Sequence, residues 1–503
     1  MTGSDAEPMT MYRQRTTACL RCALTVAFVV SIAMTDGLAQ SAPEPERFWP
    51  EWRGPLGTGV APYGDPPLSW DESTNIRWKT NVPGLGSATP VVWDDRLFVL
   101  TAVPSGAEVP SSDGVFTRLR RRFLRGNAST RTQRFIVMAL DRRDGRVVWE
   151  RVAREELPHE GTHETGTWAS PSAVVDGEVV CAFFGSRGLY CYDLDGRLLW
   201  DTDLGDMRVR LGFGEGASPT LYRDLLIVLW DHEGESFIVA LDKRTGRERW
   251  RTARDEMTSW STPRVVTVAD GAQVVTSATG AVRGYDVDTG RQLWEDEGVT
   301  LNAIPSPVAA DGVVFVTSGY RGNRLAAIDL ASARGDIRGS DAVLWSVDRD
   351  TPYVPSPVLY NGQLYVLKSN NGILTSFVAR TGQLVYGPER LPGIRSLYAS
   401  PVAADRRIYI PSRDGTTLVV AAGPSFEVLS ANLLRAGLVS ERELDTGYRD
   451  PDQPLPTLLP GPTEPAPSGA SEAPAFGINN AVLVRNLHPR GHTRVPHYVR
   501  GKP

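Results

Sequence analysis

The chain has 503 residues, with 54 Lys and Arg against 59 Asp and Glu and a formal net charge of −5. This balance provides no basic surface for nucleic acid, so we expect no nucleic-acid partner. Four Cys in the whole chain exclude a disulfide-stapled scaffold and a Cys-rich zinc protein. The length suggests several domains or one large repeat architecture.

Residues 1–39 have the features of an export signal. Arginines precede a short apolar run at residues 23–34, and small residues precede Gln40. The run is shorter than the roughly 20 residues that span a bilayer. We expect residues 1–39 to be a cleaved signal peptide, or alternatively an uncleaved anchor. The mature protein would be periplasmic or extracellular, without a membrane span after cleavage, and residues 40–74 would form an extended segment.

Residues 75–434 are repetitive. A hydroxyl residue followed by Pro and an apolar run recurs seven times, and the last six intervals are 44 to 50 residues. The steps are Thr89-Pro90, Ser170-Pro171, Ser218-Pro219, Thr262-Pro263, Ser306-Pro307, Ser356-Pro357 and Ser400-Pro401. A Gly four residues before an aromatic residue recurs in step with them. These pairs are Gly145/Trp149, Gly196/Trp200, Gly246/Trp250, Gly290/Trp294 and Gly382/Tyr386.

Each repeat contains four short apolar runs separated by Asp-Gly, Asn-Gly or Thr-Gly, which are typical turn sequences between strands. About 45 residues and four strands per unit indicate an all-β fold, a β-propeller of four-stranded antiparallel blades. We expect the periodic Trp residues to pack between neighbouring blades, where a large ring buries most surface.

The ends of the repeat predict how the ring closes. Residues 75–83 resemble a fourth strand without its first three, so the design is eight-bladed, with seven legible blades from about residue 87. The missing strands should follow residue 434, but residues 435–503 are rich in Pro, Gly, Ser and Arg. Such a composition favours a disordered tail, or one produced by a frameshift. The eighth blade is then degraded or incomplete, or the ring closes with seven.

The repeats resemble the quinoprotein-like (PQQ-like) β-propeller family, whose mark is Ala-x-Asp-x-x-Thr-Gly-x-x-x-Trp. Residues 240–250 match this pattern, and the stretches at 49–55 and 70–79 resemble secreted bacterial members. The resemblance covers roughly residues 48–434 and implies the fold. The family includes quinone-dependent dehydrogenases and an outer-membrane barrel-assembly propeller lipoprotein, so it does not determine the activity.

Three local features call for chemistry or for a structural explanation. Residues 159–163 match H-E-x-x-H, but Gly161 and the strand that follows leave no room for a helix, so we expect a loop and no zinc. Cys181 and Cys191 flank a turn; we expect two buried thiols, with a disulfide as the alternative. The Arg-rich insertion at 118–134 should be a solvated loop, or alternatively a docking site for an anionic lipid or partner.

The loops that enter the first strand of a blade and those that join strands two and three share one face. These loops are longer and more varied than the turns opposite, so we predict that this face binds the ligand. The candidate ligand-binding residues on it are His159, His163, Arg187, His232, Tyr320, Arg321 and Lys368.

These features favour a non-catalytic, extracytoplasmic binding or scaffold protein of the cell envelope, with an unknown envelope protein or polymer as its ligand. The alternative is a PQQ- or metal-dependent oxidoreductase. The dehydrogenases of the resembling family carry an adjacent Cys-Cys pair, which this chain lacks. We therefore expect no catalytic residues, no bound PQQ and no metal.

Overall fold

The computed structural model describes residues 44–107, 129–434, 476–478 and 481–485. Its helical elements are three 3-10 turns, η1 (Glu44–Arg47), η2 (Gly185–Arg187) and η3 (Arg210–Gly212). Within these ranges no helix combines the length and hydropathy needed to cross a membrane. The predicted signal, most of the Arg-rich insertion and most of the tail after residue 434 lie outside the described residues.

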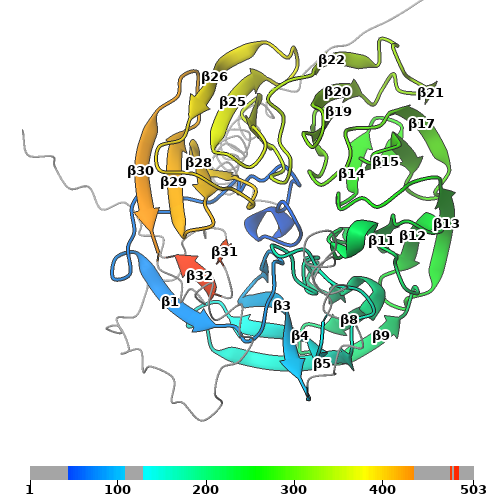
Figure 1. Cartoon of the computed structure of the whole chain (residues 1–503), viewed down its shortest axis with the longest axis vertical. Coiled ribbons are helices and arrows are strands. Elements are labelled where there is room, and N and C mark those ends of the chain that lie inside the picture. Colours follow the sequence, from blue (N-terminus) through cyan, green and yellow to red (C-terminus); the bar gives the residue numbers. More distant parts are fainter. Residues whose placement is uncertain (1–43, 108–128, 435–475, 479–480, 486–503) are drawn as a thin grey trace, which may run out of the picture. The chain divides into compact units, whose positions relative to one another are not determined.

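Seven antiparallel sheets follow one another in chain order around a ring, and we call them blades 1 to 7 (Figure 1). Blade 1 contains β2 (Val91–Trp93), β3 (Arg96–Ser105), β4 (Thr132–Asp141) and β5 (Val147–Glu156). Blade 2 contains β6 (Val174–Val175), β7 (Val179–Phe183), β8 (Leu189–Asp193) and β9 (Leu198–Thr202). Blade 3 contains β10 (Thr220–Tyr222), β11 (Leu225–Trp230), β12 (Ser236–Asp242) and β13 (Glu248–Arg254).

The second half of the ring repeats this order with one addition. Blade 4 contains β14 (Arg264–Val268), β15 (Gly271–Thr276), β16 (Ala281–Asp286) and β17 (Gln292–Glu297), and β21 (Gly335–Asp336) joins it as a parallel fifth strand. Blade 5 contains β18 (Val308–Ala310), β19 (Val313–Ser318), β20 (Arg324–Asp329) and β22 (Val343–Val347). Blade 6 contains β23 (Val358–Tyr360), β24 (Gln363–Leu367), β25 (Ile373–Val378) and β26 (Leu384–Arg390). Blade 7 contains β27 (Val402–Ala404), β28 (Arg407–Pro411), β29 (Thr416–Ala421) and β30 (Val428–Leu433).

The repeated hydroxyl residues bond one blade to the next near the axis. Each except that of blade 7 donates its backbone N–H to the hydroxyl of its counterpart in the following blade; outside blade 2 the next residue is Pro, which has no N–H to satisfy. The six bonds, each 2.8–3.1 Å long, link Thr89, Ser172, Ser218, Thr262, Ser306, Ser356 and Ser400 in that order. In blade 2 this position belongs to Ser172, two residues after the Ser170 of the sequence repeat.

The periodic Trp residues pack between blades, as the sequence predicted. Each indole N–H donates to a carbonyl of the next blade; that of Trp250, for example, bonds Val287 O at 2.9 Å. The ring lies against the turn glycine of that next blade, here Gly290, whose φ is +72°. Five aromatic rings share this arrangement: Trp78, Trp149, Trp200, Trp250 and Trp345. Trp294 differs, because its N–H bonds Gln273 within its own blade.

The N-terminal residues lie at the seam between blades 7 and 1. Trp49 exchanges backbone hydrogen bonds with Val92 of β2, and Ala403 of β27 donates to Gly59 and accepts from Ala61. One buried cluster here combines side chains of both blades with Trp49 and Trp70. The strand β1 (Ile76–Asn81) is also at this seam, and Trp78 in it packs on blade 1, as predicted for a fourth strand.

The strand β1 pairs with a sheet formed by residues beyond 434. It is antiparallel to β32 (Ala481–Arg485), which pairs in turn with β31 (Phe476–Ile478). The sheet has three strands, so the strand partners expected after residue 434 include these eight residues of the tail. The eight-blade design and the origin of the rest of the tail stay predictions.

Cys181 and Cys191 are directly opposite each other on β7 and β8, with their Cα atoms 4.1 Å apart, and they form a disulfide. The expectation of two buried thiols is therefore wrong. Both residues are fully buried, as expected, but the antiparallel register places their side chains on the same face of the sheet.

Candidate functional site

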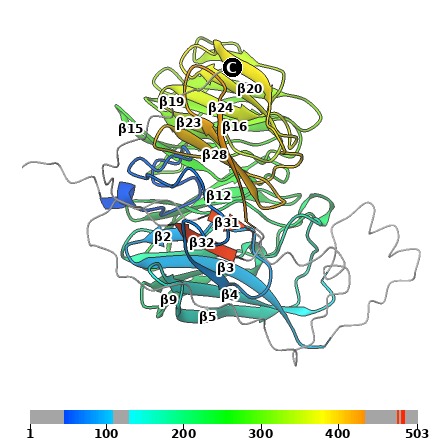
Figure 2. The ribbon, with the colours of Figure 1, turned by 90° about the vertical axis from the view of Figure 1, so that its left-hand side faces the viewer.

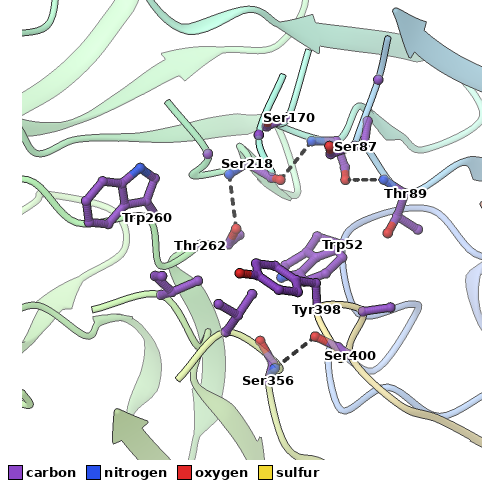
Figure 3. Close-up of a pocket in the computed structure, with 18 of the residues that line it drawn as sticks. Trp52, Ser87, Thr89, Ser170, Ser218, Trp260, Thr262, Ser356, Tyr398 and Ser400 are labelled. Carbon is purple, nitrogen blue, oxygen red and sulfur yellow. Dashed lines mark hydrogen bonds between the residues drawn. The ribbon is translucent and has the colours of Figure 1, made fainter. Parts of the chain in front are cut away.

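A cavity of about 490 Å³ lies on the axis, among the loops that enter the first strands of the blades. This is the face with the longer loops, which we call the loop-rich face; the opposite one, with the short turns, is the short-turn face. The hydroxyl residues that link the blades line the wall of the cavity. Figure 3 shows the rings of Trp52 and Tyr398 within the circle formed by these hydroxyl-bearing residues.

Residues 49–61 lie at the centre of the ring (Figures 1 and 2). Trp49, Trp52 and Arg53 of this segment line the cavity, and we call the segment its floor. The backbone and side chains of the segment bond six of the seven blades. The anchors are Trp49 to Val92, Pro50 to Val175, Glu51 to Arg264, Trp52 to Ser306, and Arg53 to the carbonyls of Pro357 and Pro401.

Arg53 is the central anchor of this floor. Its side chain is 3% exposed and donates to Pro401 O at 2.9 Å and Pro357 O at 2.7 Å. Burial lowers the pKa of Arg53 to about 9, because its polar partners are carbonyl oxygens and no carboxylate of the described residues forms an ion pair with it.

Six Phe, Trp and Tyr side chains line the cavity. Trp49 is buried, at 4% exposure, and the other five are partly exposed. They come from the floor and from the loops that enter blades 3, 4, 6 and 7: Trp52, Phe213, Trp260, Tyr353 and Tyr398. The indole N–H groups are already bonded, that of Trp260 to Gly214 O at 2.7 Å and that of Trp52 to Ser306 Oγ at 3.0 Å. The apolar parts of the two indoles are therefore what these residues offer to a ligand.

Asn302 is a buried amide residue of the wall. It is 4% exposed, its φ is +57°, and its amide donates weakly to the Tyr353 hydroxyl at 3.4 Å. Its Oδ1 has no hydrogen-bond partner in the described structure. Buried acceptors without partners are rare in native proteins, and strained backbone gathers at functional sites.

Charge is distributed unevenly in the cavity. Glu215 is half-buried, and desolvation raises the pKa of its carboxyl, although hydrogen bonds from the Ser186 backbone N–H and hydroxyl act in the opposite direction. Arg413 at the rim is exposed, and its guanidinium lies 4.9 Å from the centre of the Tyr398 ring. No carboxylate in the part of the chain that the structure describes forms an ion pair with Arg413.

The structure brings some of the predicted face residues together and separates others. His163 lines the cavity, with its ring 5.0 Å from that of Phe213. His159 and Arg187 form a pair outside it, where Arg187 Nη2 donates to His159 Nδ1 at 2.9 Å. Arg187 is buried and also forms ion pairs with Glu156 and Asp206.

The remaining four predicted residues lie in loops between the second and third strands. His232 is buried, and both ring nitrogens bond the backbone, at Arg208 N and Glu235 O. The Tyr320 ring stacks on Tyr353 at 4.8 Å and is covered by Arg321. Lys368 forms an ion pair with Asp350 at 2.6 Å. Because Arg187 and His232 have internal partners, our candidate site is the axial cavity; the binding role of the seven residues stays a prediction.

The H-E-x-x-H segment forms a loop between β5 and β6. His159 Nε2 bonds Met207 O, Glu160 accepts from the Val209 backbone N–H, and His163 Nδ1 bonds Thr165 Oγ1. Across the described ranges, no three His, Cys, Asp or Glu side chains are grouped in a way that could hold a metal ion.

Sequence reasoning missed the aromatic lining, although a signal for it exists. Trp260 and Tyr398 lie two residues before the hydroxyl step, Tyr353 three and Phe213 five residues before it. The chain turns towards the axis just before the first strand of each blade, so side chains at these positions surround the cavity.

The family of outer membrane protein assembly factor BamB matches residues 63–209, 133–335 and 234–426. The chain belongs to this family. A relative from Yersinia pestis with the same description is 26% identical over 261 residues, which are 48% of this chain and 58% of that protein. One from Alteromonas naphthalenivorans is 30% identical over 220 residues, 39% of this chain and 49% of its own length. The chain thus spans less than two thirds of these relatives.

Solved structures with the same kind of fold include BamB from Moraxella catarrhalis and a quinohemoprotein alcohol dehydrogenase from Comamonas testosteroni. The first is 17% identical with a TM-score of 0.42, covering 66% of this chain and 91% of that one. The second is 14% identical with a TM-score of 0.43, covering 87% and 86%. The expected all-β propeller and its PQQ-like repeat family are confirmed.

Proposed function

We propose that the protein is a non-catalytic, extracytoplasmic propeller that binds a component of the cell envelope at its axial cavity and loop-rich face. The observation that carries this proposal is the cavity itself, which is concave, rich in aromatic side chains and built on a rigid ring. Membership of a family named for outer membrane protein assembly supports an envelope location and an envelope protein or polymer as partner. The Cys181–Cys191 disulfide suits an oxidising compartment such as the periplasm.

The residues of the cavity do not fit the quinone site of the dehydrogenases in the wider repeat family. The chain has no adjacent Cys pair, and the one carboxylate that lines the cavity, Glu215, is bonded to Ser186. We therefore derive no redox step. Adding PQQ and calcium ions to the purified protein tests this directly, and retained cofactor with dye-linked turnover would overturn the proposal.

Co-sedimentation with isolated outer membranes and with peptidoglycan sacculi tests the binding function. The Phe213→Ala/Tyr398→Ala variant should lose binding, because both rings line the cavity. A matched Leu198→Ala/Leu384→Ala variant changes two exposed side chains on outer strands and should bind as the wild type does. Equal binding by the wild type and both variants, with unchanged unfolding midpoints, would show that the cavity is not the binding site.

A further inference from the structure

We propose that the axial cavity binds a short saccharide that carries a carboxylate. This inference rests on the proposed binding function and narrows it to one class of ligand. Three independent features of the wall lead to it: the available aromatic surfaces, the unpaired acceptor of Asn302 and the uncompensated positive charge of Arg413.

The aromatic side chains favour a ligand with apolar ring faces. Trp52 and Trp260 are fixed by their indole hydrogen bonds, so a ligand gains contact area without ordering these side chains. The C–H bonds of a sugar ring carry partial positive charge and match the negative face of an aromatic ring. An aliphatic ligand would use the same rings but would leave the polar part of the wall unpaired.

Asn302 requires a hydrogen-bond donor from the ligand. Its Oδ1 lacks a partner while the residue is 96% removed from solvent, and a hydroxyl or amide N–H of a saccharide would satisfy it. Tyr353 beside it places a hydroxyl within 3.4 Å of the Asn302 amide, so this wall presents donors and acceptors together. A sugar hydroxyl, which donates and accepts at once, fits this arrangement.

Arg413 indicates that the ligand carries an acidic group. Its guanidinium stacks over Tyr398 and has no acidic partner among the described residues, whereas Glu215 across the cavity is bonded to Ser186. A planar guanidinium held over a ring can bind a carboxylate with two hydrogen bonds. Arg53 and Arg413 line the cavity without an ion-pair partner among the described residues, against the single carboxylate of Glu215, so the net formal charge of the described lining is positive.

The shape of the cavity favours a short ligand. Its volume of about 490 Å³ lies within the range of small-molecule sites. Residues 49–61 lie on the axis, and Trp52 and Arg53 anchor them to the surrounding blades, so we expect a ligand to enter from the loop-rich face and to end against this segment. An oligosaccharide end meets this condition, whether it comes from a uronic acid polymer or from a peptidoglycan strand without its stem peptides, in which the lactyl group of muramic acid carries a free carboxylate.

Isothermal titration calorimetry with the full-length mature protein tests the proposal. The probes are digalacturonate, the disaccharide of N-acetylglucosamine and N-acetylmuramic acid, and neutral galactobiose. We expect at least one of the two acidic probes to bind more tightly than galactobiose, and the stronger of them identifies the source. Arg413→Gln should weaken that binding at least tenfold, because it removes a charge-assisted hydrogen-bond pair.

Arg223→Gln is the matched control. Arg223 also lies over a tyrosine ring, that of Tyr222 at 4.8 Å, but at the β10–β11 turn on the short-turn face. It should leave affinity unchanged. Asn302→Asp keeps the size of the side chain, and Asp tolerates positive φ as Asn does. The added negative charge should weaken binding of the acidic probes more than binding of galactobiose.

Two results would overturn the ligand class: equal affinity for acidic and neutral probes, or no saccharide binding while PQQ or a peptide with a free C-terminal carboxylate binds. In either case, persistent co-sedimentation with envelope fractions would leave the proposed function standing. If the folded wild-type protein neither co-sediments with envelope fractions nor binds any saccharide probe, both the proposed function and the ligand class are wrong.

Discussion

A substitution at the turn glycine that each inter-blade Trp contacts allows the energy of that contact to be measured. Gly290 lies in the turn between β16 and β17 with φ +72°, and an added Cβ would be 2.4 Å from Cε3 of Trp250. Gly312 lies in the turn between β18 and β19 with φ +76°, and an added Cβ would meet no atom within 4 Å. The two positions share the backbone conformation and differ in the neighbouring ring.

Gly312→Ala should therefore lower the free energy of unfolding by only about 1–2 kcal/mol, the cost of holding Ala in the left-handed backbone conformation. Gly290→Ala should cost this and a further 1–3 kcal/mol or so, because Trp250 must move, strain its packing and weaken its hydrogen bond to Val287 O. Urea unfolding followed by circular dichroism measures both variants without depending on the fluorescence of the displaced ring.

A double-mutant cycle separates the clash from other effects. In a Trp250→Ala background, which alone should cost about 3–5 kcal/mol, most of the extra cost of Gly290→Ala over Gly312→Ala should disappear. The remainder comes from Thr252 Oγ1, which the added Cβ would still meet at 2.9 Å. Equal costs of the two glycine substitutions in the wild type would refute the reasoning. The repeated glycine would then serve the turn alone, and its coincidence with the Trp of the preceding blade would carry no energy.

Three further predictions concern buried groups. Burial raises the pKa of Glu215 in the folded state above its value in the unfolded state. The contribution of this carboxyl to stability is therefore full at a pH below the unfolded-state pKa and is lost as the pH rises through the folded-state pKa. In urea unfolding, Glu215→Gln should accordingly gain stability relative to wild type between pH 4 and pH 7. Reducing agent should lower wild-type stability by about 2–3 kcal/mol and leave Cys181→Ala/Cys191→Ala unchanged. Asp231→Ala leaves the buried Arg254 without its ion-pair partner and should lower the free energy of unfolding by about 3–5 kcal/mol. Asp336→Ala, at an exposed ion pair, should lower it by under about 1 kcal/mol.

The period of the sequence was enough to predict the ring, the order of its strands and the place of most Trp residues between blades, because these features recur along the chain. Features that occur once were harder to predict. Ser172 replaces Ser170 in the hydroxyl chain because β6 begins only at Val174. The Cys181–Cys191 disulfide depends on a register that no local pattern specifies.

The candidate site was predictable only in outline. The choice of the loop-rich face followed from loop lengths, and the cavity does open among those loops. Its floor could not be deduced, since Trp52 and Arg53 contact residues more than 250 positions away in the chain. Residues with a distinctive side chain, such as His232, drew attention from the sequence, but the structure gives them internal partners.

Closure of the ring and integrity of the cavity depend on the same N-terminal segment. The chain of hydroxyl bonds runs from Thr89 to Ser400 and does not return, and at this break Trp49 bonds blade 1 while Gly59 and Ala61 bond blade 7. Between these contacts, Trp52 and Arg53 form the floor of the cavity. The Pro-rich residues after 434 are therefore not the sole means of joining blades 7 and 1. A ligand that rests on this floor would also stabilise the closed ring, because opening the seam would remove part of its site.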